Sequence, residues 1–179
     1  MKRKDAVLEN RVIVFIDIHN YSIAAQALGD ERWLFLQETY ETLGEIIVVH
    51  GGEIIKYLGD GLLCIFPGGA ENDAVGCALE LRKAFSDLVD PRSLPPDTEL
   101  EIGIGSGRVA IGMFGHRSLL QKEVFGETVL RAAAIGHHRG VAITERVYER
   151  VKSDYETRKL PERRIKWQAE PLPVWEVVE

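Results

Sequence analysis

Hydrophobic and polar positions along the chain follow two periods, one typical of strands and one typical of helices. Alternating or short continuous apolar runs predict strands at 11–18, 53–57, 62–66, 100–105, 109–113, 141–143, 164–167 and 173–178. Apolar residues at helical spacing predict helices at about 22–49, 72–89, 126–135 and 144–151. The first helix is either continuous or broken near Gly29-Asp30, and Asn72 or Asp73 is expected to cap the second.

The order of these elements predicts the fold class. Strands alternate with helices, but the runs on either side of Asp60-Gly61 form a predicted β-hairpin with a tight turn. This combination indicates an α+β fold, with a mostly antiparallel sheet and helices on one face. The simplest topology of this kind is a ferredoxin-like βαββαβ core. We interpret residues 1–10 as a polar leader and residues 11–179 as a single domain.

Composition and charge limit the classes of protein to which the chain can belong. The chain has 179 residues, of which 45% are hydrophobic and 28% charged, as expected for a soluble globular domain. The net charge of −6 argues against nucleic acid or a membrane surface as the main partner. No apolar run approaches the ~20 residues needed to span a bilayer. We therefore expect a cytoplasmic protein that binds neither nucleic acid nor membrane.

Two aspartates are the strongest chemical signal. Asp17 ends the first strand inside an otherwise apolar run, and Asp60 lies at the tip of the predicted hairpin. A βαβ-hairpin layout places the first strand beside this hairpin, so the two carboxylates can converge at one edge of the sheet. Carboxylates a few Å apart repel each other, and a hard divalent cation relieves that repulsion. A common hairpin turn at Asp60 and a strand-end cap at Asp17 are the alternative interpretations.

The segment after Asp17 leads from a strand into a helix. Backbone N–H groups at a helix start suit a polyphosphate, so Asn20, Tyr21 and Ser22 are candidate substrate-binding residues. His19 is interpreted as a solvated loop histidine, and His137-His138 as a cap at a helix C-terminus.

Several segments resemble, in order and at matching intervals, the motifs of class III nucleotidyl cyclases, the family of adenylate and guanylate cyclase catalytic domains. These segments are 15–22, 52–61, 103–115, 124–129, 143–148 and the tail 171–178. The resemblance covers residues 10–178. It implies an enzyme that converts a nucleoside triphosphate to a 3′,5′-cyclic nucleotide and pyrophosphate, for intracellular second-messenger signalling. It also implies a homodimer with the nucleotide at the interface.

The resemblance implies a role for individual residues. Asp17 and Asp60 would be catalytic and would bind two divalent cations, Mg²⁺ or Mn²⁺, with the Ile18 carbonyl as a further metal ligand. Lys56 and Glu123 would contact the base from the opposite chain. A donor and an acceptor of this kind suit adenine, so ATP is the leading substrate. Cytosine also carries an exocyclic amine, so a pyrimidine triphosphate, as in bacterial antiphage cyclases, stays open.

Two positions depart from the family pattern. The asparagine that orients the ribose is replaced by Leu130, and the arginine that stabilises the transition state by Ala134. Arg131 lies about 100° around the helix from the asparagine position and cannot simply substitute for it. Other possible donors, each interpreted first as a surface charge, are Arg108, Arg117 and Arg139.

These departures leave two functional hypotheses. One is an active cyclase, and the other is a catalytically weak or inactive module that binds nucleotide or dimerises. A diguanylate cyclase is disfavoured, because Gly51-Gly52-Glu53 is followed by Ile54 rather than by phenylalanine.

Overall fold

The computed structural model describes residues 6–178. The strands are β1 (Val7–Ile18), β2 (Glu53–Leu58), β3 (Gly61–Pro67), β4 (Leu100–His116), β5 (Leu119–Phe125), β6 (Gly140–Thr144), β7 (Thr157–Arg163) and β8 (Leu172–Val177). The helices are α1 (Tyr21–Leu28), α2 (Arg32–Val49), α3 (Glu71–Val89), α4 (Glu127–Ile135) and α5 (Glu145–Val151), with a 3₁₀ turn, η1 (Gly29–Glu31), between the first two. None of the described helices combines the length and apolarity needed to cross a bilayer.

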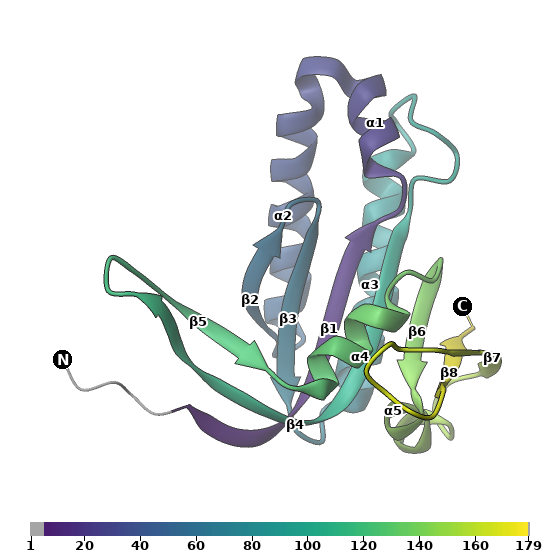
Figure 1. Ribbon diagram of the computed structural model, residues 1–179. Coiled ribbons are helices and arrows are strands. Elements are labelled where there is room, and N and C mark those ends of the chain that lie inside the picture. Colours follow the sequence, from purple (N-terminus) through teal and green to yellow (C-terminus); the bar gives the residue numbers. More distant parts are fainter. Residues whose placement is uncertain (1–5, 179) are drawn as a thin grey trace.

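All the strands belong to one sheet, in the order β2-β3-β1-β4-β6-β8-β7, with β5 paired to β4 (Figure 1). Every pairing is antiparallel except that of β4 with β6. The portion β2-β3-β1-β4, crossed by α1–α2 and then by α3, has the ferredoxin-like βαββαβ order. The predicted α+β class with a mostly antiparallel sheet is confirmed, as is the alternative of a first helix broken at Gly29.

Helices cover both faces of the sheet, so the expectation of helices on one face only is wrong. Val14 and Ile16 of β1 pack with α2 and α3 in the main core. Ile13 of β1 packs with Ala132 of α4 in a second cluster on the other face. Figure 1 shows α4 in front of the sheet and α2 and α3 behind it. The physical reason is that consecutive residues of β1 are apolar and buried, so both faces need a cover.

A close contact between α4 and β4 fixes the position of that helix. A Cβ atom on Gly103 would lie 2.1 Å from the carbonyl oxygen of Ala132, so only glycine lets the helix lie this near to the strand. Gly107 makes a similar approach to Thr128, where a Cβ would lie 2.5 Å from the hydroxyl oxygen. These two glycines therefore allow α4 to pack closely against β4.

Several predicted boundaries are corrected by the structure. The strands expected at 100–105 and 109–113 are one continuous strand, β4, and its hairpin partner β5 was not predicted. The strand expected at 164–167 is absent from that described segment, and β7 lies at Thr157–Arg163 instead. Ala70, and neither Asn72 nor Asp73, is the N-cap of α3.

The first strand is longer than expected. β1 begins at Val7, where it pairs with Ile111 of β4, so residues 7–10 of the expected polar leader belong to the sheet. The first five residues of that leader lie outside the described residues.

Candidate active site at the end of the central strands

The turn between β2 and β3 brings Asp60 to the end of β1, beside Asp17. Ile16 and Leu62 form the last pair of β1 and β3 at this end of the sheet, so Asp17 follows directly after it and Gly61 directly before it. A Cβ on Gly61 would lie 2.5 Å from the Ile16 carbonyl oxygen and 2.9 Å from Oδ1 of Asp17. Glycine at this position therefore permits the hairpin to approach the carboxylate, and the adjacent Asp60 comes with it.

Asp17 and Asp60 are two neighbouring carboxylates. Burial raises the pKa of Asp17, and the negative charge of Asp60 raises it further. Of the described residues, the positive charge that acts on Asp17 is that of His137, which lowers the pKa of Asp17 in part. Burial also raises the pKa of Asp60. Within residues 6–178, neither side chain forms an ion pair with a lysine or an arginine. Two partly buried oxygen donors that repel each other fit a hard divalent cation, which supplies the missing positive charge.

The segment that follows Asp17 enters α1 at the same end of the sheet. Asn20 adopts a left-handed backbone conformation with φ of 56°, and its Nδ2 donates to Oδ2 of Asp97 at 2.7 Å. The Tyr21 ring packs against the main core, and burial raises the pKa of its hydroxyl. Ser22 is exposed. The backbone of these three residues lies near the aspartates, and their role toward a substrate stays a prediction.

Glu101 and His137 lie beside Asp17 and were not predicted as site residues. Asp17 and Glu101 are direct partners across β1 and β4. One ligand atom each from Asp17, Glu101 and His137 lies within 4.8 Å of the other two. The sequence does contain a signal for Glu101. Like Asp17, it is a carboxylate within a mostly apolar strand, and alternating isoleucine and glycine residues follow it. His19 is no solvated loop residue, because its Nδ1 shares a hydrogen bond of 2.7 Å with Oε1 of the buried Glu101.

Lys56 and Glu123, the predicted base-contacting residues, are brought together by the structure. Nζ of Lys56 on β2 donates to Oε2 of Glu123 on β5 at 2.7 Å. Both side chains are partly buried, with 32% and 16% of their surface exposed. A second pair, Lys122 with Glu53, crosses the same two strands but is more exposed. The first pair is therefore the less exposed of the two, and its contact with a base stays a prediction.

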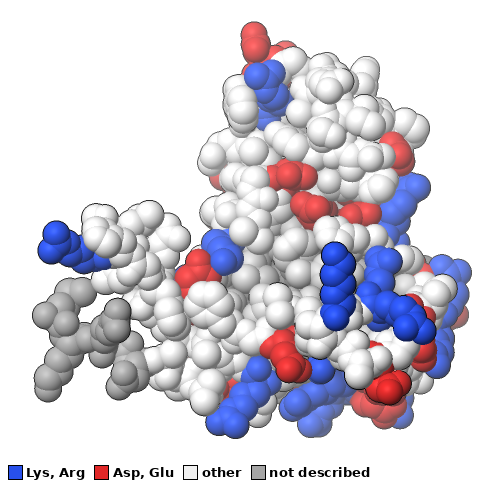
Figure 2. All heavy atoms as spheres, in the orientation of Figure 1, with Lys and Arg blue, Asp and Glu red and all other residues white. Residues whose placement is uncertain are grey.

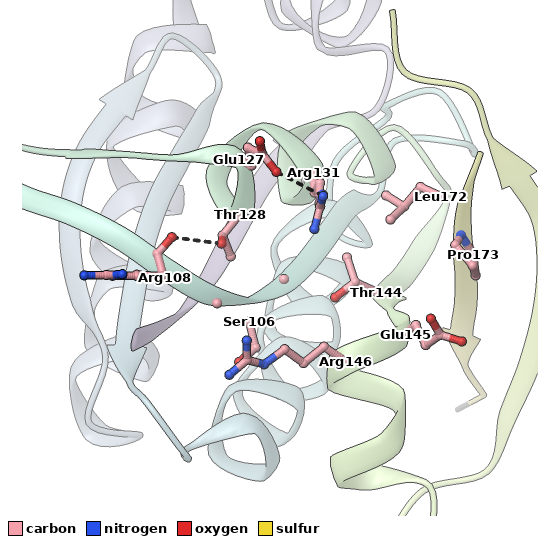
Figure 3. A pocket seen from close by; sticks show the side chains of 12 residues that line it. Ser106, Arg108, Glu127, Thr128, Arg131, Thr144, Glu145, Arg146, Leu172 and Pro173 are labelled. Carbon is pink, nitrogen blue, oxygen red and sulfur yellow. Dashed lines mark hydrogen bonds and ion pairs between the residues drawn. The ribbon is translucent and has the colours of Figure 1, made fainter. Parts of the chain in front are cut away.

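Leu130 and Ala134, which replace the family's asparagine and arginine, lie one helical turn apart on α4. Leu130 is 52% exposed. Arg131 is engaged elsewhere, because it donates to Oε1 of Gln168 at 3.2 Å and pairs with Glu127 at 3.1 Å. Figure 3 shows Arg131 directed into a cavity of about 390 Å³ between α4, β4 and the start of α5. Neither aspartate of the candidate site lines this cavity, which agrees with the expectation that Arg131 does not substitute for the asparagine.

The other arginines considered as donors are placed as follows. Arg139 forms an ion pair with Glu99. The backbone carbonyl of Arg108 accepts a hydrogen bond from Thr128, as Figure 3 shows, and its side chain is exposed. Arg117 is exposed in the turn between β4 and β5. Figure 2 shows acidic side chains near the middle of the face that carries α4, with lysine and arginine more numerous in its lower right part.

Comparison with known proteins agrees with the geometry. The family model described as the adenylate and guanylate cyclase catalytic domain matches residues 4–173. An adenylate cyclase of Anabaena cylindrica is 31% identical over 130 residues, which cover 69% of this chain but only 26% of that protein. The chain therefore spans about a quarter of this relative's length.

Solved structures show the same fold. The adenylyl cyclase CyaB from P. aeruginosa aligns with a TM-score of 0.90 and 20% identity, over 98% of this chain and 97% of that one. The guanylyl cyclase Cya2 aligns with a TM-score of 0.85 and 21% identity, over 97% and 94% of the two chains. The match of the family model along nearly the whole chain confirms the resemblance of the motifs, and the chain belongs to the adenylate and guanylate cyclase catalytic domain family, the class III nucleotidyl cyclases.

Proposed function

We propose that this domain is a nucleotidyl cyclase that converts a nucleoside triphosphate, ATP first, to a 3′,5′-cyclic nucleotide and pyrophosphate in second-messenger signalling. The observation that supports this proposal is the convergence of Asp17 and Asp60 where Gly61 contacts the end of β1. Within residues 6–178, neither carboxylate is paired with a lysine or an arginine. A carboxylate pair of this kind, in a chain of the cyclase family, supports retained catalysis.

The residues present suggest how the reaction is supported. Asp17, Asp60 and the Ile18 carbonyl would hold two divalent cations, Mg²⁺ or Mn²⁺, which lower the pKa of the ribose 3′-hydroxyl and neutralise phosphate charge. The 3′-oxygen forms a bond to the α-phosphorus, the bond from that phosphorus to the bridging oxygen breaks, and the hydroxyl proton passes to water. The N–H groups of Tyr21 and Ser22 at the start of α1 would donate hydrogen bonds to phosphate oxygens.

A second copy of the chain would complete the site. The β4–β5 hairpin projects from the body of the molecule, as Figure 1 shows. It carries large apolar side chains that the described chain leaves exposed, namely Met113, Phe114, Leu119 and Phe125. Apolar side chains gathered in this way mark a surface for another protein. A homodimer that covers this hairpin would also bring Lys56 and Glu123 of one copy toward the aspartates of the other.

The test is direct. Purified protein, at a concentration that saturates dimer formation, is incubated with each of the four NTPs and with Mn²⁺ or Mg²⁺, and products are identified by mass spectrometry. We expect cyclic AMP as the main product. Cyclic CMP or UMP in its place would support the pyrimidine alternative. Absence of product from every NTP would contradict the proposal.

One observation favours a second candidate function. Leu130 and Ala134 offer no hydrogen-bond donor on the exposed side of α4, and loss of one preorganised donor typically costs ~10²–10³ in rate. This observation supports a module with little or no turnover. Such a module would bind nucleotide and metal, or would only dimerise.

Base choice gives a separate prediction. Lys56→Glu combined with Glu123→Cys removes the donor and the acceptor that suit adenine, so the ratio of kcat/KM for ATP to that for GTP is expected to fall about 10²-fold. The matched control is Lys122→Glu, which changes a charge on the same pair of strands but in the more exposed ion pair. It should leave the ratio unchanged. An equal ratio in the double variant and the wild type would remove Lys56 and Glu123 from the base pocket.

A further inference from the structure

We propose that Glu101 and His137 are ligands, together with Asp17, for a divalent transition-metal ion, so that the site binds its ion through an imidazole nitrogen as well as carboxylate oxygens. The consequence for catalysis rests on the proposed function, whereas binding of the ion is a separate property of these three side chains.

The fold brings the three residues together from separate parts of the chain. Asp17 and Glu101 face each other across β1 and β4, and His137 follows the C-terminal end of α4. Gly136 fixes the approach of His137, because a Cβ there would lie 2.8 Å from the Phe15 ring. The His137 ring then meets the edge of Phe15, with the ring centroids 6.1 Å apart.

The spacing of the ligand atoms is close to what a metal ion requires. The three atoms lie within 4.8 Å of one another. Metal–ligand distances of ~2.0–2.3 Å place two donors at most ~4.0–4.6 Å apart on opposite sides of an ion. Side-chain movements of a few tenths of an ångström per donor, which staggered rotamers permit, therefore suffice to close the site around an ion.

The environment of Glu101 also favours binding of a cation. This residue is only 7% exposed, and its Oε1 is held by His19. Its Oε2 lies 3.9 Å from Nδ1 of His137, and no lysine or arginine of residues 6–178 forms an ion pair with it. A buried carboxylate next to the carboxylate of Asp17 is unfavourable without positive charge between them. The hydrogen bond from His19 would orient Glu101, in the manner of an outer partner of a metal ligand.

The chemistry of the donors selects the class of ion. Carboxylates and carbonyls alone suit Mg²⁺, whereas imidazole favours transition metals such as Zn²⁺, and Mn²⁺ accepts oxygen and nitrogen donors. A site with His137 beside two carboxylates should therefore bind Mn²⁺ and Zn²⁺ more tightly than Mg²⁺.

The experiment measures metal binding without nucleotide. Metal-free full-length protein is titrated with Mn²⁺ and followed by electron paramagnetic resonance, and Zn²⁺ and Mg²⁺ are compared by calorimetry. We expect His137→Ala and Glu101→Gln each to weaken Mn²⁺ binding about 10–100-fold and His19→Ala to weaken it less, with little change in Mg²⁺ binding. The matched control is His138→Ala, the neighbouring imidazole, which pairs with Glu176 and should leave Mn²⁺ binding unchanged.

The outcomes separate this inference from the proposed function. Mn²⁺ binding that survives His137→Ala and Glu101→Gln but is lost in Asp60→Asn overturns the inference and leaves the cyclase proposal standing. Binding that depends on Glu101 and His137, without cyclic product from any NTP, supports the inference while the proposed function fails. A wild-type protein that binds no Mn²⁺ also overturns it. Circular dichroism establishes that each variant is folded, and His137→Gln replaces His137→Ala if the latter unfolds.

Discussion

Replacing Asp17 by asparagine is expected to abolish cyclic-nucleotide formation without disturbing the fold. Asparagine keeps the size of the side chain beneath Gly61 but removes the negative charge that would hold a divalent cation. We expect the rate to fall by at least the ~10²–10³-fold that loss of one preorganised electrostatic group costs. The measurement is cyclic product per unit time under saturating NTP and metal, with Asp60→Asn expected to behave alike. Activity close to that of the wild type in either variant would contradict the assignment of that carboxylate.

The stability of the same variants provides a control whose sign can be worked out. Burial raises the pKa of Asp17 from its ordinary value of 3.8, so the folded state holds the proton more readily than the unfolded chain. The stabilising contribution is then present below pH 3.8 and is lost as the pH rises through the raised pKa of the folded protein. Asp17→Asn should therefore have a higher Tm than the metal-free wild type at neutral pH. A divalent cation should raise the Tm of the wild type and have less effect on the variant. A lower Tm for metal-free Asp17→Asn would contradict the view of Asp17 as a carboxylate that burial destabilises.

Local patterns were sufficient to predict the elements that form the centre of the fold. The hairpin around Gly61, the break at Gly29 and the convergence of Asp17 with Asp60 all follow from spacing along the chain. The continuity of β4 does not, because Gly107 falls in the gap between the two strands predicted at 100–105 and 109–113, whereas Gly103 and Gly107 both make room for α4. That role depends on a contact with a helix distant in sequence, which no local pattern encodes.

The strand β7 was missed for a different reason. It contains Pro161 and mostly charged, exposed residues, so it lacks the apolar alternation of a strand. Its place at the edge of the sheet explains this composition, since only one side of an edge strand pairs and proline is tolerated there. A mostly charged edge also blunts pairing with other chains.

The predicted and the missed site residues differ in the information that they require. Asp17 was predicted because it interrupts an apolar run, and Asp60 because it lies at the tip of a predicted hairpin. Glu101 interrupts a pattern too, but its significance depends on its register opposite Asp17, and that of His137 depends on the packing of Gly136 against Phe15. Register and packing between distant segments are available only from the structure, and for this reason His137 was interpreted as a helix cap.

Restoring the two missing donors on α4 is expected to raise the rate of cyclisation. In the double variant Leu130→Asn and Ala134→Arg, the new side chains lie one helical turn apart on the same side of α4, with the backbone of the helix fixed by its contact with Gly103. Each donor is expected to contribute ~10²–10³-fold to kcat if it meets the transition state. The measurement is kcat for each NTP, with the single variants showing smaller gains than the double variant.

A matched control separates this effect from a general change in the charge of α4. Arg131→Ala removes a charge at the intervening position, but that side chain faces Gln168 and Glu127 rather than the aspartates, so kcat should not change. If the double variant stays folded and dimeric without a gain in kcat, then α4 does not face the substrate as the family pattern implies. If the wild type instead already turns over rapidly, another cation must stabilise the transition state. Arg117 is then the first residue to replace, because it is exposed on the hairpin that a second copy is expected to cover.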